Sequence, residues 1–262
     1  MSDIVVIIPM YGFGELTDKC VELTRKNAGV DVDILVVDDG TPVPYRNQDA
    51  DYVLRLDVNS GFTNAINQGI LYTLKDNPYV KYIHMLNNDT EPELDFIKIL
   101  LDVMENDENV GVAGSTKIIK REPLSIENFA VDMLFGYHDY TEEHMQEEFI
   151  SCIWFGLTSA LLRTSVIREI GIFDKRFKNH CSDNDFCFRV LMAGYKVILA
   201  TKSRVFHIHE VTTRSQNLTT EEDGKRLLDK VRGVDLQRIL DELPLDCSEG
   251  NWGRLHMEVY QK

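Results

Sequence analysis

The chain has 262 residues, 44% of them hydrophobic, which is enough for one large α/β domain or for one domain with an appendage. It carries 28 Lys and Arg against 43 Asp and Glu, a formal net charge of −15. Nucleic acids are bound through basic surfaces, so this balance argues against a nucleic-acid partner. A nucleotide-sized ligand needs only a local cation or a few backbone N–H groups, and it stays compatible with the composition.

The N-terminus and the cysteines bear on the compartment. We expect no signal peptide, because no basic segment or small-residue cleavage site precedes the first apolar run. No apolar run approaches the roughly 20 residues of a transmembrane helix. The five cysteines are scattered and form no C-x-x-C pair, which fits reduced thiols in a cytoplasmic protein. A zinc site is the alternative, but the spacing of its candidates matches no common pattern: His180, Cys181, Cys187, His207 and His209.

The first half of the chain alternates apolar strands with helical patterns. The predicted strands are 4–8, 34–37, 53–56 and 82–86, and the predicted helices are 16–28, 62–74 and 94–104. A capping box over residues 90–93 predicts that the last of these helices begins directly after Asp89. The alternation predicts a mostly parallel sheet with helices on both faces.

The second half is less regular. Residues 121–150 are acidic, carry several aromatics and lack periodicity, so they read as a loop-rich insertion that bears on specificity. Thr164 is expected to cap a short helix that ends at Gly171. Further strands are predicted at 110–119, 149–155, 157–162, 197–200 and 204–209, and a further helix at 183–193. Beyond residue 220 an amphipathic helix, interrupted at Gly233, is expected to dock on its own domain, with a homodimer contact as the second interpretation.

Polar residues follow the predicted parallel strands, at the edge where open α/β sheets bind their ligands. This rim gathers Tyr11, Asp38, Asp39, Asn59 and Asp89. Asp89 closes the tripeptide Asn87-Asn88-Asp89, and a carboxylate there can hold a divalent cation against a diphosphate. For the tripeptide alone, an ordinary polar turn is the alternative.

A series of motifs in the second half adds to this rim. They are Gly171-Ile172-Phe173-Asp174, Cys181-Ser182-Asp183-Asn184-Asp185-Phe186-Cys187-Phe188-Arg189, Gly194-Tyr195-Lys196-Val197 and Arg204-Val205-Phe206-His207. With Asn59-Ser60-Gly61, Asn64, Asn67, Gly69 and Asn87-Asn88-Asp89, the series resembles the family 2 glycosyltransferases of the GT-A fold, and within them the rhamnosyltransferase-like branch. The resemblance spans residues 3–210.

The resemblance implies a GT-A type, Rossmann-like α/β domain over residues 1–215, with a C-terminal helical extension over 216–262. Within the domain, residues 1–120 would form the nucleotide-sugar half and 121–215 the acceptor half. The implied reaction is an inverting transfer from a nucleotide-diphosphate sugar donor to a hydroxyl of a carbohydrate or lipid-linked glycan acceptor, as in polysaccharide biosynthesis. The implied cofactor is Mn²⁺ or Mg²⁺. A lipid-linked acceptor would bring the cytoplasmic protein to the membrane as a peripheral protein.

The resemblance also assigns roles to single residues. Asp183 would be the general base, and Asp89 with His207 would hold the metal. The nucleotide-sugar contacts would be Pro9, Tyr11, Asp38, Asp39, Asn59, Gly61, Asn67, Asn87 and Asn88.

Each of these roles has a structural alternative. Asp38 could be a turn residue, Asp183 a helix N-terminal acid and His207 a buried strand histidine. Asn67 is expected first to bond a neighbouring loop. Asp185 and Arg189, at i and i+4, are expected to form a surface ion pair.

The sequence departs from the family pattern at three places. Asn87 stands where a first carboxylate is common, Ser182 replaces a glutamate beside the base, and Tyr11-Gly12 stands in the first nucleotide loop. The first two motivate a second hypothesis, a non-catalytic nucleotide-sugar-binding or assembly protein that keeps the fold. A nucleotidyltransferase and a nicotinamide dehydrogenase fit less well, because no glycine-rich phosphate loop follows the first strand.

Overall fold

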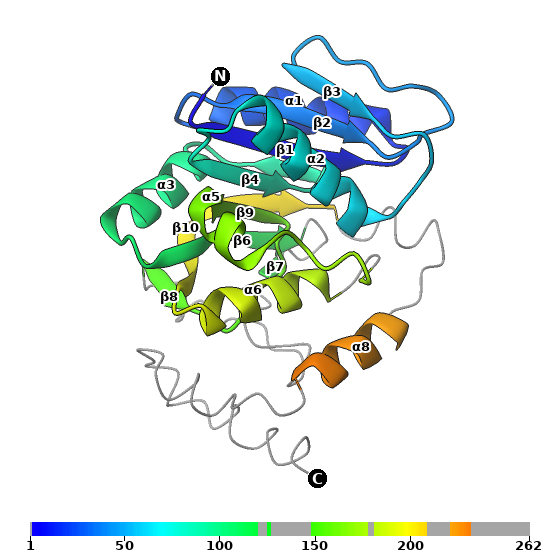
Figure 1. The fold of residues 1–262 in the computed structure, drawn as a ribbon. Helices are drawn as coiled ribbons and strands as arrows, with labels where there is room; N and C mark the ends of the chain where they lie inside the picture. The colour runs from blue at the N-terminus through cyan, green and yellow to red at the C-terminus, as the bar shows by residue number, and fades with distance from the viewer. Residues whose placement is uncertain (1, 120–124, 127–147, 178–180, 209–220, 232–262) are drawn as a thin grey trace.

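A computed structural model gives the structure of the chain and describes residues 2–119, 125–126, 148–177, 181–208 and 221–231. One ten-stranded sheet lies at its centre, with the strand order β3-β2-β1-β4-β9-β6-β10-β5; β7 pairs with β6 and β8 with β10 (Figure 1). The strands are β1 (Ile4–Met10), β2 (Asp33–Asp38), β3 (Tyr52–Arg55), β4 (Tyr82–Leu86), β5 (Thr90–Pro92), β6 (Val110–Ile119), β7 (Ser125–Ile126), β8 (Phe149–Ser151), β9 (Ser159–Arg163) and β10 (Lys196–His207).

The strand directions create one functional edge. β1 pairs in parallel with β2 and β4, and β2 pairs in parallel with β3. β9 is antiparallel to both β4 and β6, and β10 is parallel to β6. The carboxyl ends of β1, β2, β4, β6 and β10 therefore share an edge. The predicted α/β sheet flanked by helices is confirmed, although its second half is mixed rather than parallel.

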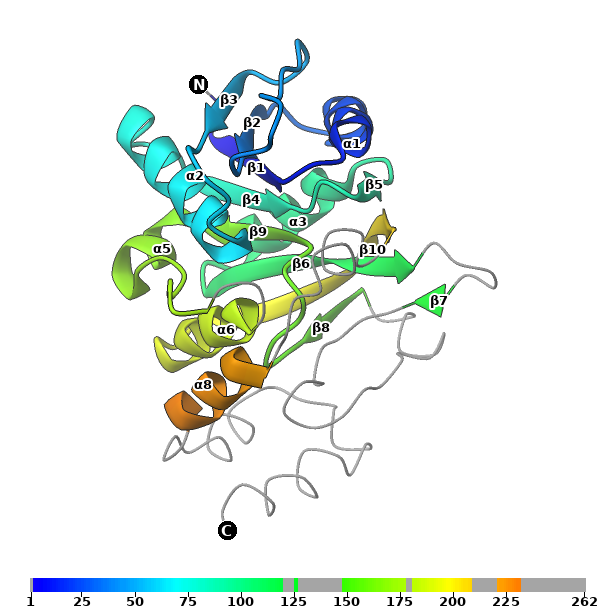
Figure 2. The same ribbon diagram turned by 90° about the vertical axis from the view of Figure 1, so that its right-hand side faces the viewer.

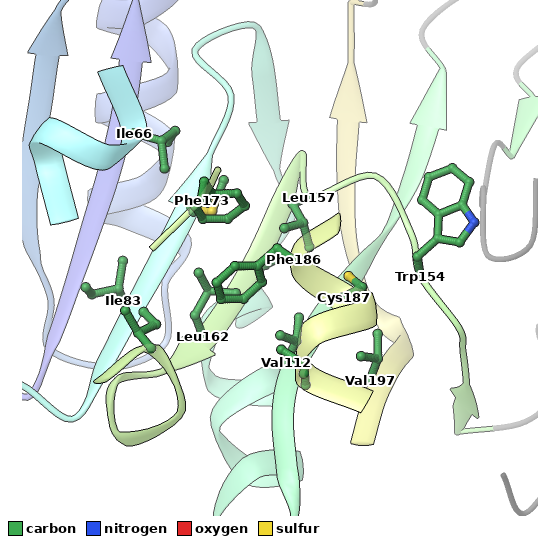
Figure 3. Packing of buried hydrophobic residues seen from close by; sticks show 14 of the residues in the cluster. Ile66, Ile83, Val112, Trp154, Leu157, Leu162, Phe173, Phe186, Cys187 and Val197 are labelled. Carbon is green, nitrogen blue, oxygen red and sulfur yellow. The ribbon is translucent and has the colours of Figure 1, made fainter. Parts of the chain in front are cut away.

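Helices cover both faces of the sheet (Figures 1 and 2). The helices are α1 (Gly14–Asn27), α2 (Phe62–Asp76), α3 (Phe96–Asn106), α5 (Thr164–Ile170), α6 (Ser182–Met192) and α8 (Glu221–Val231). Along β1, Val5 and Ile7 join the buried cluster beneath α2, α5 and α6, whereas Val6 and Ile8 join the cluster beneath α1 and α3. A β-branched run fits this strand because successive side chains enter opposite cores. Figure 3 shows the first cluster around Phe186.

The helix predicted directly after Asp89 is wrong. Residues 90–92 form β5, which pairs antiparallel with the end of β10, and α3 begins only at Phe96. The Thr90 hydroxyl donates to the carbonyl of Asn87 at 2.7 Å, which closes a turn instead of capping a helix. Pairing with β10 therefore prevails over the local capping signal.

Other boundaries also differ from the prediction. Only 149–151 of the strand predicted at 149–155 is extended, and the next strand is shifted to Ser159–Arg163. The segments predicted at 197–200 and 204–209 are one strand, β10, with a register shift between Ala200 and Arg204. Thr164 was predicted as the N-cap of α5, but it is the first helical residue, and the N-cap is Arg163, which makes no side-chain capping bond. The end of the helix at Gly171 agrees with the prediction.

The C-terminal part is described only over α8. Leu227 of α8 is 3% exposed and belongs to the cluster beneath α2, α5 and α6, so docking of this helix on its own domain is confirmed. The expected break at Gly233 and almost all of the insertion at 121–150 lie outside the described residues. Within the described ranges, no helix combines the length and the apolar character needed to cross a bilayer.

Candidate active site

The predicted rim residues follow strands that end at the shared carboxyl edge. Pro9 lies buried in β1 opposite Val37, and Tyr11 follows the strand half-buried. Asp39 is fastened to the end of β1, because its N–H donates to the Met10 carbonyl at 2.9 Å. The loops after β1 and β2 therefore meet at one place, as the strand pattern predicts.

Asp38 holds its own loop together. Its Oδ1 accepts from the N–H and hydroxyl of Thr41 at 2.9 and 2.7 Å, and its Oδ2 accepts from the Tyr45 N–H at 3.0 Å and from the Arg55 guanidinium. Burial raises the pKa of Asp38, but these hydrogen bonds outweigh it and bring the pKa below its usual value. Four donors fill the capacity of a carboxylate, so the alternative of a structural turn aspartate fits better than a base contact.

Asp39 shapes the loop before α2. Its Oδ1 accepts from the N–H and hydroxyl of Ser60 at 2.9 and 2.7 Å, and its Oδ2 accepts from the Gly61 N–H at 2.9 Å. Gly61 has φ of 87°, a conformation that glycine adopts without strain. Asn59 lies exposed at the tip of this loop, and its Oδ1 also accepts from Gly61, at 3.1 Å. Asp39 thus fixes the loop and leaves the Asn59 side chain exposed at its tip.

Asn67 bonds a neighbouring loop, as first expected. Its Nδ2 donates to the Phe173 carbonyl at 2.9 Å, and its Oδ1 accepts from the Phe173 N–H at 3.0 Å. The side chain is 3% exposed. Both ends of its amide are engaged in joining α2 to the loop after α5, so we leave Asn67 out of the proposed donor site.

The Asn87–Asp89 turn is braced from behind by α1. The Asn88 amide donates to the Thr17 hydroxyl at 3.0 Å, and the Cys20 thiol donates to the Asn87 carbonyl at 3.5 Å. Thr17 and Cys20 lie on the same face of α1, three residues apart. An aspartate at position 88 could not donate this bond when ionised. Asn88 therefore has a supporting role, and Asp89 is the anionic residue of the turn.

Asp89 and His207, which are far apart in the sequence, meet at the rim. Asp89 Oδ1 lies 3.1 Å from His207 Nε2, and both side chains are largely buried. The end of β10 is held there by its pairing with Thr90 and by the Ile208 N–H, which donates to the Asp89 carbonyl at 3.0 Å. The two predicted metal ligands are thus brought together.

The pair fits a divalent cation. Neighbouring ligands of an octahedral ion at about 2.1 Å lie about 3 Å apart, and the observed Oδ1–Nε2 separation agrees with this. Carboxylate oxygen and imidazole nitrogen are ordinary ligands of Mn²⁺, and a diphosphate commonly completes such sites. Within residues that the structure describes, no group of three or more His, Cys, Asp and Glu side chains converges on a metal position. The zinc alternative gains no support there; its His180 and His209 lie outside the described residues.

Asp183 lies partly buried in the first turn of α6. Its Oδ1 accepts from the Asn184 N–H at 2.9 Å, and a Cβ built on Gly156 would lie 3.9 Å from its Oδ2. Thr158 follows Gly156 by two residues, and its carbonyl accepts from the Asn87 N–H at 2.9 Å. Gly156 and Thr158 are at most about 7 Å apart, so one short segment links the base candidate to the metal turn.

The expected ion pair of Asp185 and Arg189 forms, but its carboxylate is buried instead of lying at the surface. Arg189 Nε lies 3.0 Å from Asp185 Oδ2, and the Asp185 side chain is only 5% exposed. Arg189 also donates to the carbonyls of Ile170, Gly171 and Ile172. The pair therefore ties α6 to the loop after α5, and the prediction of a surface role is wrong.

Sequence reasoning missed several supporting residues. Arg55 is the last residue of β3 and pairs with Asp38, and its only sequence signal was a basic residue near the end of the strand predicted at 53–56. Thr17 and Cys20 brace the metal turn from α1, but their spacing reads as an ordinary helix face. Cys20, Cys152, Cys181 and Cys187 are buried thiols outside any disulfide, and burial raises the pKa of the Cys20 thiol to about 12, so we regard these thiols as packing residues.

The chain matches the family model described as "Glycosyl transferase family 2" over residues 5–171. The chain belongs to glycosyl transferase family 2. The match contains Asp89 and the nucleotide-sugar candidates, and it ends before Asp183 and His207. The family 2 assignment therefore rests on the half of the rim built by β1, β2 and β4, and the other two residues join it through the geometry described above.

A solved structure has the same fold as this family 2 domain. The crystal structure of GalNAc-T7 with UDP, GalNAc and Mn²⁺ superposes with a TM-score of 0.61 at 13% sequence identity. The superposition covers 78% of this chain and 43% of that one, so the chain spans less than half the length of that structure. No curated protein matches the chain in sequence.

An open hollow of about 480 Å³ lies apart from these residues. Its lining contains none of the predicted site residues and is formed by Arg176, Glu222, Lys225, Arg226, Asp229 and Lys230. Asp174 pairs with Arg176 and Lys230, and Asp223 pairs with Arg226. Since these cations face carboxylates of the protein, we assign the hollow no anionic ligand and place the active site of the family 2 domain at the rim.

Proposed function

We propose that this chain is an inverting glycosyltransferase that moves a sugar from a nucleotide-diphosphate donor to an acceptor hydroxyl. The observation that carries the proposal is the 3.1 Å contact between Asp89 Oδ1 and His207 Nε2 at the carboxyl edge of the sheet. The family supports glycosyl transfer as the reaction class. The motifs of the second half favour a donor and acceptor of the rhamnosyltransferase-like branch, with a carbohydrate or lipid-linked glycan as acceptor.

In this mechanism the nucleotide lies along the loops after β1 and β2. Tyr11 and Asn59 are the ligand-facing candidates there, while Asp38 and Asp39 keep both loops in shape. Asp89 and His207 would hold a divalent cation and, with it, the diphosphate of the donor. A bound Mn²⁺ or Mg²⁺ neutralises the charge that develops on the leaving diphosphate, an effect worth several kcal/mol in such sites.

Asp183 takes the proton of the acceptor hydroxyl. Its Oδ1 is oriented by the Asn184 N–H, and Gly156 brings no side chain against its Oδ2. A positioned carboxylate contributes about 10²–10⁴-fold in rate as a general base. Attack from the face opposite the leaving diphosphate inverts the anomeric carbon.

The test replaces the base and measures binding and transfer separately. Asp183→Asn should lower transfer by at least about 10²-fold and leave nucleotide affinity within twofold of wild type, because the amide keeps the shape and loses the basicity. Asp102→Asn, an exposed acid on α3, is the matched control and should behave as wild type. Near wild-type turnover in Asp183→Asn would remove this residue from the mechanism.

A non-catalytic nucleotide-sugar binder is the second candidate. Ser182, which is 2% exposed, and Asn87 favour it because they stand where the family pattern commonly has acidic residues. Calorimetry with UDP-, GDP- and dTDP-sugars, with and without Mn²⁺, separates the two functions. Binding of one donor with no product from any acceptor class would favour the binder.

A further inference from the structure

We infer that Lys230 of α8 is a positioning residue for Asp183, and this inference rests on the proposed function. Lys230 lies beyond the family 2 match, on a helix of the C-terminal extension. Its Nζ lies 2.7 Å from Asp174 Oδ2 and also contacts Asp185 Oδ1. One ammonium group therefore bridges the loop after α5 to the first turn of α6, two residues from the base.

The bridge adds a shared cation to two carboxylates that also pair with Arg176 and Arg189 separately. The side chains of Asp174 and Asp185 are 14% and 5% exposed. Arg176 and then Lys230 donate hydrogen bonds that hold the pKa of Asp174 well below its usual range against the opposing effect of burial. Lys230 thus adds positive charge between two carboxylates, and without it they would lie together with less compensation.

The remaining contacts make this region one unit. The rings of Phe173 and Phe186 stack with centroids 4.4 Å apart, and Arg189 joins α6 to the carbonyls of the loop that contains Phe173. Asn67 fastens the same loop to α2. The α6 start is thus fixed from the α2 side by buried contacts, and from the α8 side by the Lys230 bridge.

Contacts of α8 with Phe177 and Arg176 fix the position of Lys230. Lys230 Nζ and the Arg226 guanidinium lie 5.3 and 5.8 Å from the centre of the Phe177 ring, within cation–π range. Arg226 also donates to the Arg176 carbonyl at 2.7 Å. With Leu227 buried beneath them, these contacts fix the helix that carries Lys230. Displacement of a catalytic group by about 1 Å costs up to about 100-fold in rate, so a contact this close to the base bears on turnover.

The test compares Lys230→Met, which keeps the aliphatic stem, with Lys230→Arg, which keeps the charge. We expect Lys230→Met to lower kcat about tenfold, with donor affinity unchanged within twofold, and Lys230→Arg to recover most of the loss. Lys98→Met removes an ordinary exposed ion pair with Asp102 and is the matched control, expected at the wild-type kcat. All rates are taken per folded protein, at a temperature where each variant is fully folded.

Hydrogen exchange gives a second readout that does not need turnover. The N–H of Asn184 donates to Asp183 Oδ1 and that of Asp185 to the Cys181 carbonyl, and both should exchange about tenfold faster in Lys230→Met. Unchanged exchange, an unchanged kcat in Lys230→Met, or an equal loss in Lys230→Arg would overturn the inference. Failure of the proposed function gives a different pattern: no turnover in wild type, with the exchange difference between the two variants intact.

Discussion

His84 is buried in β4 at the end of a chain of hydroxyl groups that crosses the sheet. The chain runs from His84 Nε2 through Ser159, Ser115 and Ser203, with separations of 3.2, 2.8 and 2.7 Å. Ser203 donates its single proton to the Phe96 carbonyl, so each hydroxyl before it must donate forward. His84 must then donate from Nε2, and its Nδ1, which has no hydrogen-bond partner in the described part of the chain, carries the lone pair.

The buried His84 makes the fold sensitive to acid. Burial lowers its pKa from the ordinary 6.5 to about 3. Between these values the unfolded state binds more protons than the folded state, so the unfolding free energy falls as the pH falls, by about 1.4 kcal/mol per pH unit for this group. His84→Gln keeps an N–H donor for Ser159 and does not titrate. Its unfolding free energy should therefore fall less steeply than that of wild type from pH 6 to 4.

Denaturant unfolding at several pH values measures this difference. Comparison with wild type at each pH cancels the contributions of the many carboxylates that titrate in the same range. Parallel curves for the two proteins would show that His84 is protonated without cost in the folded state, against the burial argument.

The Asp89–His207 pair predicts the metal dependence of transfer. Asp89→Asn removes the anionic ligand of the described pair and should raise the Mn²⁺ concentration for half-maximal activity at least about tenfold. His207→Gln should act in the same direction. Activity is measured after chelation by EDTA and titration with Mn²⁺, with Asp102→Asn as the control. Full wild-type activity in EDTA would contradict a metal role for both residues.

Among the elements, α2 shows how closely a helix approaches the sheet. A Cβ at Gly69 would lie 2.6 Å from Ile7 Cγ2 and 3.1 Å from Val37 Cγ2, both on strands beneath α2. Alanine in a helix is favoured over glycine by about 1 kcal/mol, whereas overpacking costs about 1–3 kcal/mol. Gly69→Ala should therefore lower the unfolding free energy, by up to about 2 kcal/mol.

Gly224 of α8 is the matched helical glycine. A Cβ there would meet nothing within 4 Å, so only the helix propensity changes. Gly224→Ala should raise the unfolding free energy by up to about 1 kcal/mol. Chemical denaturation of both variants checks the opposite signs, and a stabilised Gly69→Ala protein would mean that α2 shifts at no cost.

Elements that bury both faces could be predicted from sequence, and elements defined by their partners could not. β1, β2 and β4 are continuous apolar runs, and each lies within about two residues of its predicted place. β5 is short and polar and exists because β10 offers it a pairing edge. The register shift in β10 likewise depends on β6, which no local pattern contains.

The site residues also divide into those that local sequence patterns predict and those whose contacts depend on the folded structure. The alternation of strands and helices correctly predicted one rim after β1, β2 and β4. The meeting of Asp89 with His207 followed from the family resemblance, because no spacing rule joins such distant residues. The hydrogen bonds by which Asp38 holds its own loop together could not be predicted, because the donors Thr41, Tyr45 and Arg55 take their positions only in the folded loop.

At the scale of the molecule, the described part of the C-terminal extension belongs to the domain on which it lies. The boundary predicted at residue 215 separates α8 from α6, yet Leu227 enters the same core cluster as Phe186, and Lys230 bridges Asp174 and Asp185. We therefore expect a chain that ends at residue 215 to be less stable than one that keeps α8.

Two truncated chains, ending at residues 231 and 215, isolate the contribution of α8. Burial of one leucine stabilises a fold by about 1.5–3 kcal/mol, and in a chain of this size each kcal/mol shifts the Tm by about 2–4 °C. The chain ending at 215 should therefore unfold at least about 3 °C below the chain ending at 231. The rim after β1, β2 and β4 is built without α8, so any nucleotide sugar that stabilises the full chain in the presence of Mn²⁺ should stabilise both truncated chains equally. Equal Tm values for the two chains would show that residues 1–215 form an independent domain and that α8 only rests on its surface.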